Sequence, residues 1–326
     1  MKSLYLTFDE IKNKQASRLI YGTGTPLIAG EDKEMAFACF DLAWQCGFRT
    51  YDTAHTYGNS EKYLGEWMAK RGNRDQLVLI DKGCNPGQAG YNETFSVDTI
   101  RSQVKESQNR LQTECFDFYL IHRDDETQPV DSIVEVLNEL KSQGAIIHFG
   151  VSNWKKERIQ AANQYAEEHG LTGFSAISPS FSLADLANDL WGGSITLSGK
   201  ENAGFRSFLE QNQMPVFNYS SLARGYLSGR YDPDGGKPIE GCLHEVSIRE
   251  YDSPENRDRL RRAFQLAREK GCSPTQICLA WVLGQKMNLF PIVSPSSKEH
   301  MEENMKTFEI SMSEKELHWL ETGEEF

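Results

Sequence analysis

Short runs of β-branched and aromatic residues alternate with longer segments of helical periodicity along the whole chain. The predicted strands are Arg18–Gly24, Phe48–Asp52, Leu77–Lys82, Phe116–His122, Ile146–Ser152, Phe174–Ser178, Val216–Tyr219 and Leu289–Val293. The predicted helices are Glu31–Cys46, Ser60–Lys70, Val97–Leu111, Val130–Gln143, Lys155–Glu168, Gly204–Gln211, Pro254–Gly271, Pro274–Gln285, Lys298–Lys306 and Glu314–Leu320. This alternation predicts repeated strand–helix–strand units with parallel strands.

Eight strands, each followed by a helix, are the number that closes a (β/α)8 barrel, which takes about 250 residues plus insertions. An open doubly wound sheet usually has fewer strands and a companion domain. The 326-residue chain therefore predicts the α/β class, as a single TIM barrel domain over residues 1–326. Two segments, Ser182–Asn202 and Ser220–Ser253, are expected to be long loops at the carboxyl-terminal face of the barrel.

Charge and apolar content exclude several classes of partner. With 47 acidic against 35 basic side chains, the net charge of −12 opposes binding to nucleic acid or an anionic bilayer. The chain shows neither a signal peptide nor an apolar run near the ~18 residues of a membrane helix. Its seven cysteines include no C-x-x-C pair, which favours reduced thiols. We expect a cytoplasmic protein with no nucleic-acid or membrane partner, and the oligomeric state stays open.

Chemically active side chains follow three neighbouring predicted strands. Asp52 ends the second strand, Lys82 ends the third and His122 ends the fourth, while Tyr57 lies five residues after Asp52. Reactive groups of barrel enzymes gather at these strand ends. Taken singly, each residue has a more common structural role, such as a turn former or a buried histidine. Their joint placement is what favours a catalytic site.

The alternation of side chains along the third strand orients Lys82. Val78, Ile80 and Lys82 share one face, so Asp81 is expected to point away from the site. A buried lysine needs a counter-ion, and Asp52 on the adjacent strand is the expected one.

A cation beside Tyr57 is expected to lower the pKa of its phenol from about 10 and to make it a general acid. His122 would hydrogen-bond the same substrate oxygen and orient it. This division of labour suits carbonyl reduction, in which a hydride reaches carbon and a proton reaches oxygen.

Two other types of site, a dinucleotide-binding turn and a hydrolytic metal centre, fit the sequence less well. The glycine-rich segment Gly22–Gly30 lacks the G-x-G-x-x-G spacing of a dinucleotide-binding turn. A hydrolytic metal centre would draw on His55, His122, Asp52 and Asp124. No H-x-H strand motif supports such a centre and Lys82 would repel the cation, so we predict no metal site.

Six segments together resemble the aldo-keto reductase family, in its bacterial type with a long loop after strand seven. They are GFRTYDTAHTYGNSEKYLG (Gly47–Gly65), DFYLIH (Asp117–His122), GVSNW (Gly150–Trp154), YSSLARGYLSGRY (Tyr219–Tyr231), SPTQICLAWVL (Ser273–Leu283) and PSSKEHMEEN (Pro295–Asn304). The resemblance spans nearly the whole chain in the family's order. It implies a (β/α)8 barrel that interconverts carbonyls and alcohols with NADPH or, less often, NADH. It also implies a catalytic tetrad of Asp52, Tyr57, Lys82 and His122.

The resemblance further implies a set of nucleotide-binding residues. Ser152, Asn153 and Ser178 correspond to the carboxamide contacts, Tyr219 to the ring that stacks on the nicotinamide, and Ser220, Leu222 and Arg230 to the pyrophosphate loop. Gly24 and Thr25 lie in a segment that lines the cofactor, Ser296 and His300 lie near the 2′-phosphate position, and Glu303 and Asn304 correspond to adenine contacts.

Two departures from the family pattern bear on the nucleotide. Ser178 stands where the family commonly has a longer Gln, and Lys298 is the only permanent cation near the 2′-phosphate position. Hydroxyls hold a dianionic phosphate less tightly than a guanidinium does. NADP(H) is therefore favoured only slightly, with NAD(H) as the alternative. The substrate is expected to be a small aldehyde, ketone or sugar-like carbonyl; a nucleotide-binding sensor or accessory subunit with little turnover is the alternative function.

Overall fold

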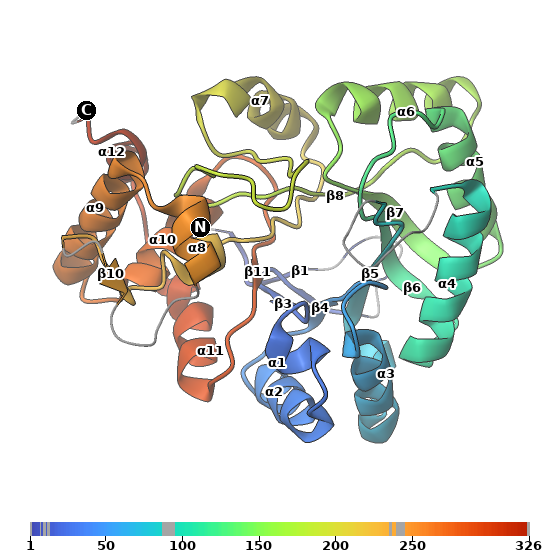
Figure 1. The fold of residues 1–326 in the computed structure, drawn as a ribbon, viewed down its shortest axis with the longest axis horizontal. Helices are drawn as coiled ribbons and strands as arrows, with labels where there is room; N and C mark the ends of the chain where they lie inside the picture. The colour runs from blue at the N-terminus through green and yellow to red at the C-terminus, as the bar shows by residue number, and fades with distance from the viewer. Residues whose placement is uncertain are drawn as a thin grey trace. The chain divides into compact units, whose positions relative to one another are not determined.

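The computed structural model (Figure 1) describes residues 2–6, 8, 11, 14–86, 95–234, 237–238 and 245–324. The chain divides into two compact units. The sheet unit comprises Tyr5–Ser178 and Ser294–Lys298. The helical unit comprises Met1–Leu4, Pro179–Val293 and Glu299–Phe326. Among the predicted features, Cys242 lies outside the described residues, and the single-domain organisation stays a prediction.

The sheet unit is built on parallel strands that match the first six predicted ones. In spatial order they are β3 (Ile20–Gly22), β4 (Thr50–Asp52), β5 (Val78–Gly83), β6 (Phe116–Ile121), β7 (Ile146–Ser152) and β8 (Ile177–Ser178). Buried residues dominate these runs, as expected for parallel strands covered on both faces. Parallel pairing brings their carboxyl ends to one edge, and the alternation with helices confirms the α/β class.

The helices of the sheet unit follow the predicted order. They are α2 (Lys33–Gln45), α3 (Ser60–Arg71), α4 (Val97–Leu111), α5 (Val130–Ser142) and α6 (Lys156–Glu168). Their ends obey local rules: Ser96 caps α4 by accepting the Thr99 N–H, and Gly72 ends α3 at φ 61°. The sequence prediction missed the single turn α1 (Pro26–Ala29), the 3₁₀ turn at Arg74–Gln76, and the antiparallel pair β1 (Tyr5–Leu6) and β2 (Ala16–Ser17).

The packing of β4 shows which side of the sheet faces the helices. The Tyr51 ring lies 5.6 Å from the Trp67 ring of α3 and 6.4 Å from the Phe40 ring of α2, so Tyr51 points toward the helices. Tyr51 is in register with Leu79 of β5. Because side chains alternate, Leu79 and Asp81 share this helix-facing side, whereas Asp52 and Lys82 lie on the opposite side.

The helical unit contains the predicted C-terminal helices and one more. They are α7 (Ala203–Asn212), α8 (Glu245–Tyr251), α9 (Pro254–Lys270), α10 (Pro274–Gly284), α11 (Lys298–Met305) and α12 (Glu314–Thr322), with 3₁₀ turns at Lys200–Asn202, Ala223–Gly225 and Lys306–Glu309. The predicted eighth strand is shortened to β11 (Ile292–Val293). The predicted strand Val216–Tyr219 forms only isolated parallel bridges, Val216 with Leu289 and Tyr219 with Ser180.

The two predicted long loops differ in the structure. Ser220–Ser253 is not a continuous loop, because it contains α8 and the antiparallel pair β9 (Tyr231–Asp232) and β10 (Lys237–Pro238). The described part of the chain contains no helix with the length and apolarity needed to cross a membrane.

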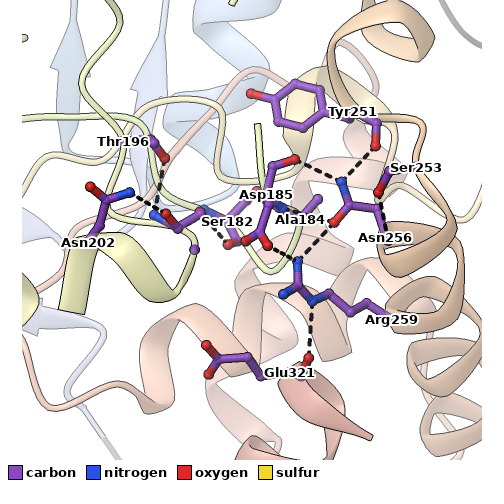
Figure 2. Close-up of polar contacts among 12 residues, drawn as sticks. Ser182, Ala184, Asp185, Thr196, Asn202, Tyr251, Ser253, Asn256, Arg259 and Glu321 are labelled. Carbon is purple, nitrogen blue, oxygen red and sulfur yellow. Dashed lines mark hydrogen bonds and ion pairs between the residues drawn. The ribbon is translucent and has the colours of Figure 1, made fainter. Parts of the chain in front are cut away.

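The other loop, Ser182–Asn202, is irregular up to its last turn, yet it is anchored at its start (Figure 2). The buried Asn256 side chain accepts the Asp185 N–H at 2.9 Å and donates to the carbonyls of Asp185 at 2.8 Å and Tyr251 at 2.7 Å. Arg259 adds an ion pair with Asp185 at 2.8 Å and donates to the Glu321 carbonyl at 3.1 Å. These bonds tie the loop to α9, and α9 in turn to α12, within the helical unit.

Candidate active site

The four predicted catalytic side chains all belong to the sheet unit. Asp52 ends β4, Lys82 is the penultimate residue of β5, and His122 directly follows β6. The Lys82 ammonium forms an ion pair with Asp52 and donates a hydrogen bond to the Thr53 carbonyl at 2.9 Å. Both charged side chains are buried. The predicted counter-ion of Lys82 is therefore confirmed.

The Tyr57 ring is enclosed by groups from three neighbouring segments. Lys82 Nζ lies 5.2 Å from its centroid, and the His122 ring approaches it edge to face with centroids 5.6 Å apart. A Cβ atom added at Gly24 would lie 2.8 Å from Tyr57 Cε2 and 3.0 Å from Cδ2 and Cζ. The ring can occupy this position because residue 24 has no side chain, which brings one predicted cofactor residue into contact with the predicted acid.

The expected lowering of the Tyr57 pKa is wrong. Burial raises the pKa of the phenol, and this outweighs the opposing attraction of the Lys82 ammonium; Asp52 raises it further. The sequence identified the neighbouring charges, whereas desolvation depends on the complete fold around the ring. A raised pKa keeps the phenol protonated at neutral pH, which is the state a general acid requires.

His122 is a neutral imidazole in this environment. Burial lowers its pKa well below the ordinary value, and the charges of Lys82 and Arg123 lower it further. Its Nδ1 is buried and has no hydrogen-bond partner among the described residues. A neutral ring with an unused nitrogen beside Tyr57 can hydrogen-bond a small polar group.

The predicted carboxamide contacts lie together at the ends of β7 and β8. Ser152 Oγ donates to the Ser178 carbonyl at 2.7 Å, and Asn153 Nδ2 donates to Ser152 Oγ at 3.1 Å. The same Asn153 amide donates to the His122 carbonyl at 3.4 Å, and Asn153 adopts φ 58°. Adjacent hydroxyl and amide groups beside His122 fit the donors and acceptors of a nicotinamide carboxamide.

The other predicted nucleotide residues of the sheet unit lie near β3. Thr25 precedes α1, and its carbonyl accepts the Ala29 N–H at 2.8 Å. The segment Ser294–Lys298 is joined to β3 by the Ser294 hydroxyl, which donates to the Gly22 carbonyl at 2.7 Å. Ser296 of this segment is exposed.

The remaining predicted nucleotide residues belong to the helical unit. They are Tyr219, Ser220, Leu222, Arg230, His300, Glu303 and Asn304. Ser220 has a left-handed backbone at φ 52°, and the exposed Arg230 donates to Ser228 Oγ at 3.0 Å. Asn304 is buried. Their grouping with the tetrad stays a prediction.

Two of the four residues of the alternative metal centre are paired with other side chains. His55 Nε2 lies 3.1 Å from Glu106 Oε2, and Asp124 pairs with Arg158 at 2.8 Å. Sequence patterns did not reveal a group of polar side chains on the helix-facing side of β5, which consists of the buried Glu61, Asp81 and Ser107 and the partly exposed Arg110. The strand alternation was the only signal for it, since it placed Asp81 on that side.

Comparisons with known proteins give one family model and several relatives. The model of the "Aldo/keto reductase family" matches residues 18–322. The chain is 27% identical over 319 residues to a norsolorinic acid reductase of Aspergillus flavus, covering 94% of this chain and 76% of the relative. It is 29% identical over 325 residues to norsolorinic acid reductase B of Aspergillus parasiticus, covering 94% and 79%.

A putative aryl-alcohol dehydrogenase of Saccharomyces cerevisiae is 27% identical over 315 residues, covering 89% of this chain and 77% of the relative. The family match covers nearly the whole chain. Together with the parallel strands and alternating helices, it confirms the predicted (β/α)8 fold class.

Proposed function

The chain belongs to the aldo/keto reductase family, and we propose that it reduces the carbonyl group of an aldehyde, ketone or sugar-like substrate to an alcohol with NADP(H). One observation carries the proposal: Tyr57 lies within reach of both a buried, ion-paired Lys82 and a neutral His122. NAD(H) remains the alternative nucleotide. The names of the relatives favour aryl compounds among the carbonyls to be tested.

Tyr57 donates the proton to the carbonyl oxygen of the substrate. Burial works against the charge on Lys82, but the ion pair with Asp52 holds the pKa of Lys82 above its ordinary value, so the ammonium stays charged. This cation stabilises the phenolate that remains after proton transfer. His122, neutral at pH 7, orients the same oxygen through a hydrogen bond.

A nicotinamide held by Ser152 and Asn153 would supply the hydride. The hydrogen bond from Asn153 to the His122 carbonyl supports this assignment, because it joins the carboxamide contacts to a member of the tetrad. The other nucleotide contacts, which the resemblance assigns to residues of the helical unit, remain part of this proposal. Exposed Ser296 and Lys298 offer weak retention of a 2′-phosphate, so the preference for NADP(H) is expected to be modest.

Replacement of Tyr57 by Phe tests the proposal. Loss of the positioned acid should reduce kcat by about 10²–10⁴-fold in assays of NADPH oxidation with aryl and alkyl aldehydes, while nucleotide affinity stays the same. Tyr165→Phe is the matched control, since Tyr165 lies on α6 and its hydroxyl donates to Glu135 of α5 in an exposed contact. Full activity in Tyr57→Phe would contradict the acid role.

A nucleotide titration of the unaltered protein separates the alternative function. Ser178, in place of a longer amide side chain, is the observation that favours a sensor or accessory subunit. Tight binding of either nucleotide with no turnover on the whole panel would support that alternative. Turnover that depends on Tyr57 would exclude it.

A further inference from the structure

Asp81 is a fully buried carboxyl group that the proposed mechanism does not use. It directly precedes Lys82 in β5, and its side chain points to the helix-facing side of the sheet. Its exposed fraction is 0%. Neither carboxyl oxygen has a hydrogen-bond partner among the residues that the structure describes. A carboxylate in this position would have lost its hydration, and no hydrogen bond from a described residue replaces it.

The elements packed against Asp81 supply a second carboxyl group. Glu61 of α3 is 1% exposed, and α4 contributes the buried Ser107 and the partly exposed Arg110. Arg110 Nη1 donates to Glu61 Oε2 at 2.9 Å and to the His55 carbonyl at 3.2 Å.

The Arg110 guanidinium also contacts another carboxylate, that of Glu106. Arg110 Nη2 reaches the half-exposed Glu106 at 3.3 Å, and His55 contacts the same carboxylate at 3.1 Å. In the described part of the chain, Arg110 donates hydrogen bonds to Glu61, Glu106 and the His55 carbonyl. None of them goes to Asp81. Glu61 Oε1 and Ser107 Oγ are also buried and have no hydrogen-bond partner among the described residues.

Of the two buried carboxyl groups, Glu61 and Asp81, only Glu61 is therefore in contact with the Arg110 guanidinium. An isolated buried carboxylate takes up a proton before it stays charged at a cost of several kcal/mol. Burial, followed by repulsion from Glu61, raises the pKa of Asp81 well above its ordinary value. The Lys82 backbone N–H, the Lys82 charge and the Ser107 hydroxyl act in the opposite direction and are outweighed.

We propose that Asp81 is a neutral carboxylic acid in the folded protein, so that Glu61 and Arg110 remain a matched ion pair behind Lys82. An ionised Asp81 would raise the pKa of both Lys82 and Tyr57. The proton on Asp81 thus limits the upward shift at the general acid. This effect on Tyr57 rests on the proposed function, whereas the proton on Asp81 does not.

Urea unfolding between pH 5 and about pH 9 tests the proton directly, with Asp81→Asn as the variant that preserves shape and neutrality. The native state binds a proton that the unfolded chain releases above about pH 3.9. The unfolding constant of the unaltered protein should therefore rise by about tenfold per pH unit until the native Asp81 ionises. Asp81→Asn lacks this slope, so its stability relative to the unaltered protein should increase with pH. Parallel pH profiles would overturn the proposal.

Asp117→Asn is the matched control from the adjacent strand β6. Asp117 is also 0% exposed, but it is paired with Lys14 at 2.5 Å and Arg74 at 2.9 Å and accepts the Leu79 N–H at 2.8 Å. Its replacement should destabilise the protein at neutral pH, because it leaves cations without their partner. A buried carboxyl group that is fully paired thus gives the opposite result to Asp81.

Infrared difference spectroscopy at neutral pH identifies the protonated group. The carbonyl band of a carboxylic acid should disappear in Asp81→Asn and remain in Glu61→Gln. A band lost in Glu61→Gln but kept in Asp81→Asn would place the proton on Glu61 and overturn the proposal.

The alkaline limb of the kcat/KM profile gives the link to Tyr57. It should move to lower pH in Asp81→Asn, since the variant cannot add a negative charge that holds the phenol proton. An unaltered protein without reductase activity would contradict the proposed function alone, because the unfolding and infrared results do not depend on turnover.

Discussion

Lys82 and Asp81 are consecutive residues of β5, both buried, on opposite sides of the same sheet. On the Lys82 side, the ammonium has a carboxylate and a backbone carbonyl as partners. On the helix-facing side, Arg110 contacts Glu61, and neither Asp81 oxygen has a hydrogen-bond partner among the residues that the structure describes. One residue step along the strand thus separates a paired charge from an unpaired carboxyl group.

The difference shows two ways in which a fold accommodates ionisable groups without water. A charge that has to act on Tyr57 is retained by a partner of opposite sign, because only a charged Lys82 attracts the phenolate. Asp81, a carboxyl group without a role in the proposed mechanism, is instead neutralised by a proton. Substitutions on the two sides of β5 should therefore differ in the size and in the pH dependence of their effects.

Lys82→Met should have the largest effect, because it leaves the buried Asp52 without its counter-ion. We expect a loss of about 3–5 kcal/mol in the free energy of unfolding, measured with urea at pH 7, in addition to loss of activity. The double variant Asp52→Asn/Lys82→Met should recover much of the stability but none of the activity. A loss below about 1 kcal/mol in the single variant would contradict a strong buried pair.

Gly24→Ala tests the placement of Tyr57 on the Lys82 side. The new Cβ would lie 2.8 Å from the Tyr57 ring, so the ring has to shift away from its present contacts with Lys82 and His122. A displacement of this kind should lower kcat/KM by on the order of 10²-fold. Gly204→Ala is the control, since no atom lies within 4 Å of its added Cβ and α7 favours Ala over Gly. Equal activities of the two variants would show that Gly24 does not position Tyr57.

The sequence analysis was most accurate where local pattern determines structure. Buried strands with period-two alternation placed Asp52 and Lys82 on one side of the sheet and Asp81 on the other. It failed where a short element is stabilised by its surroundings. Helix α8, of seven residues, and the single turn α1 were both missed, and Val216–Tyr219 keeps only isolated bridges.

Contacts between elements distant in sequence were beyond reach for a related reason. Glu61 lies 49 residues before Arg110, and only the packing of α3 on α4 brings the two together. The pKa of Tyr57 was misjudged in the same way, since Lys82 was visible in the sequence as a neighbour but the desolvation of the phenol was not.

Two buried serines, Ser152 at the end of β7 and Ser107 of α4, give the smallest contrast between a paired polar group and one with no described partner. Ser152 Oγ donates to the Ser178 carbonyl and accepts from Asn153, whereas Ser107 Oγ has no described partner. Ser152→Ala should therefore cost about 1 kcal/mol of unfolding free energy, and Ser107→Ala should change it by less than about 0.5 kcal/mol.

The stability of the same two variants should also depend differently on pH. The Ser107 hydroxyl lowers the pKa of Asp81 although it is not at hydrogen-bonding geometry to either carboxyl oxygen. Its removal should therefore extend the decline of stability with rising pH to more alkaline values, while Ser152→Ala should keep the profile of the unaltered protein. Urea titrations at several pH values measure both effects. A large loss of stability in Ser107→Ala would mean that its hydroxyl has a partner in solution, and the helix-facing side of β5 would then be as fully paired as the Lys82 side.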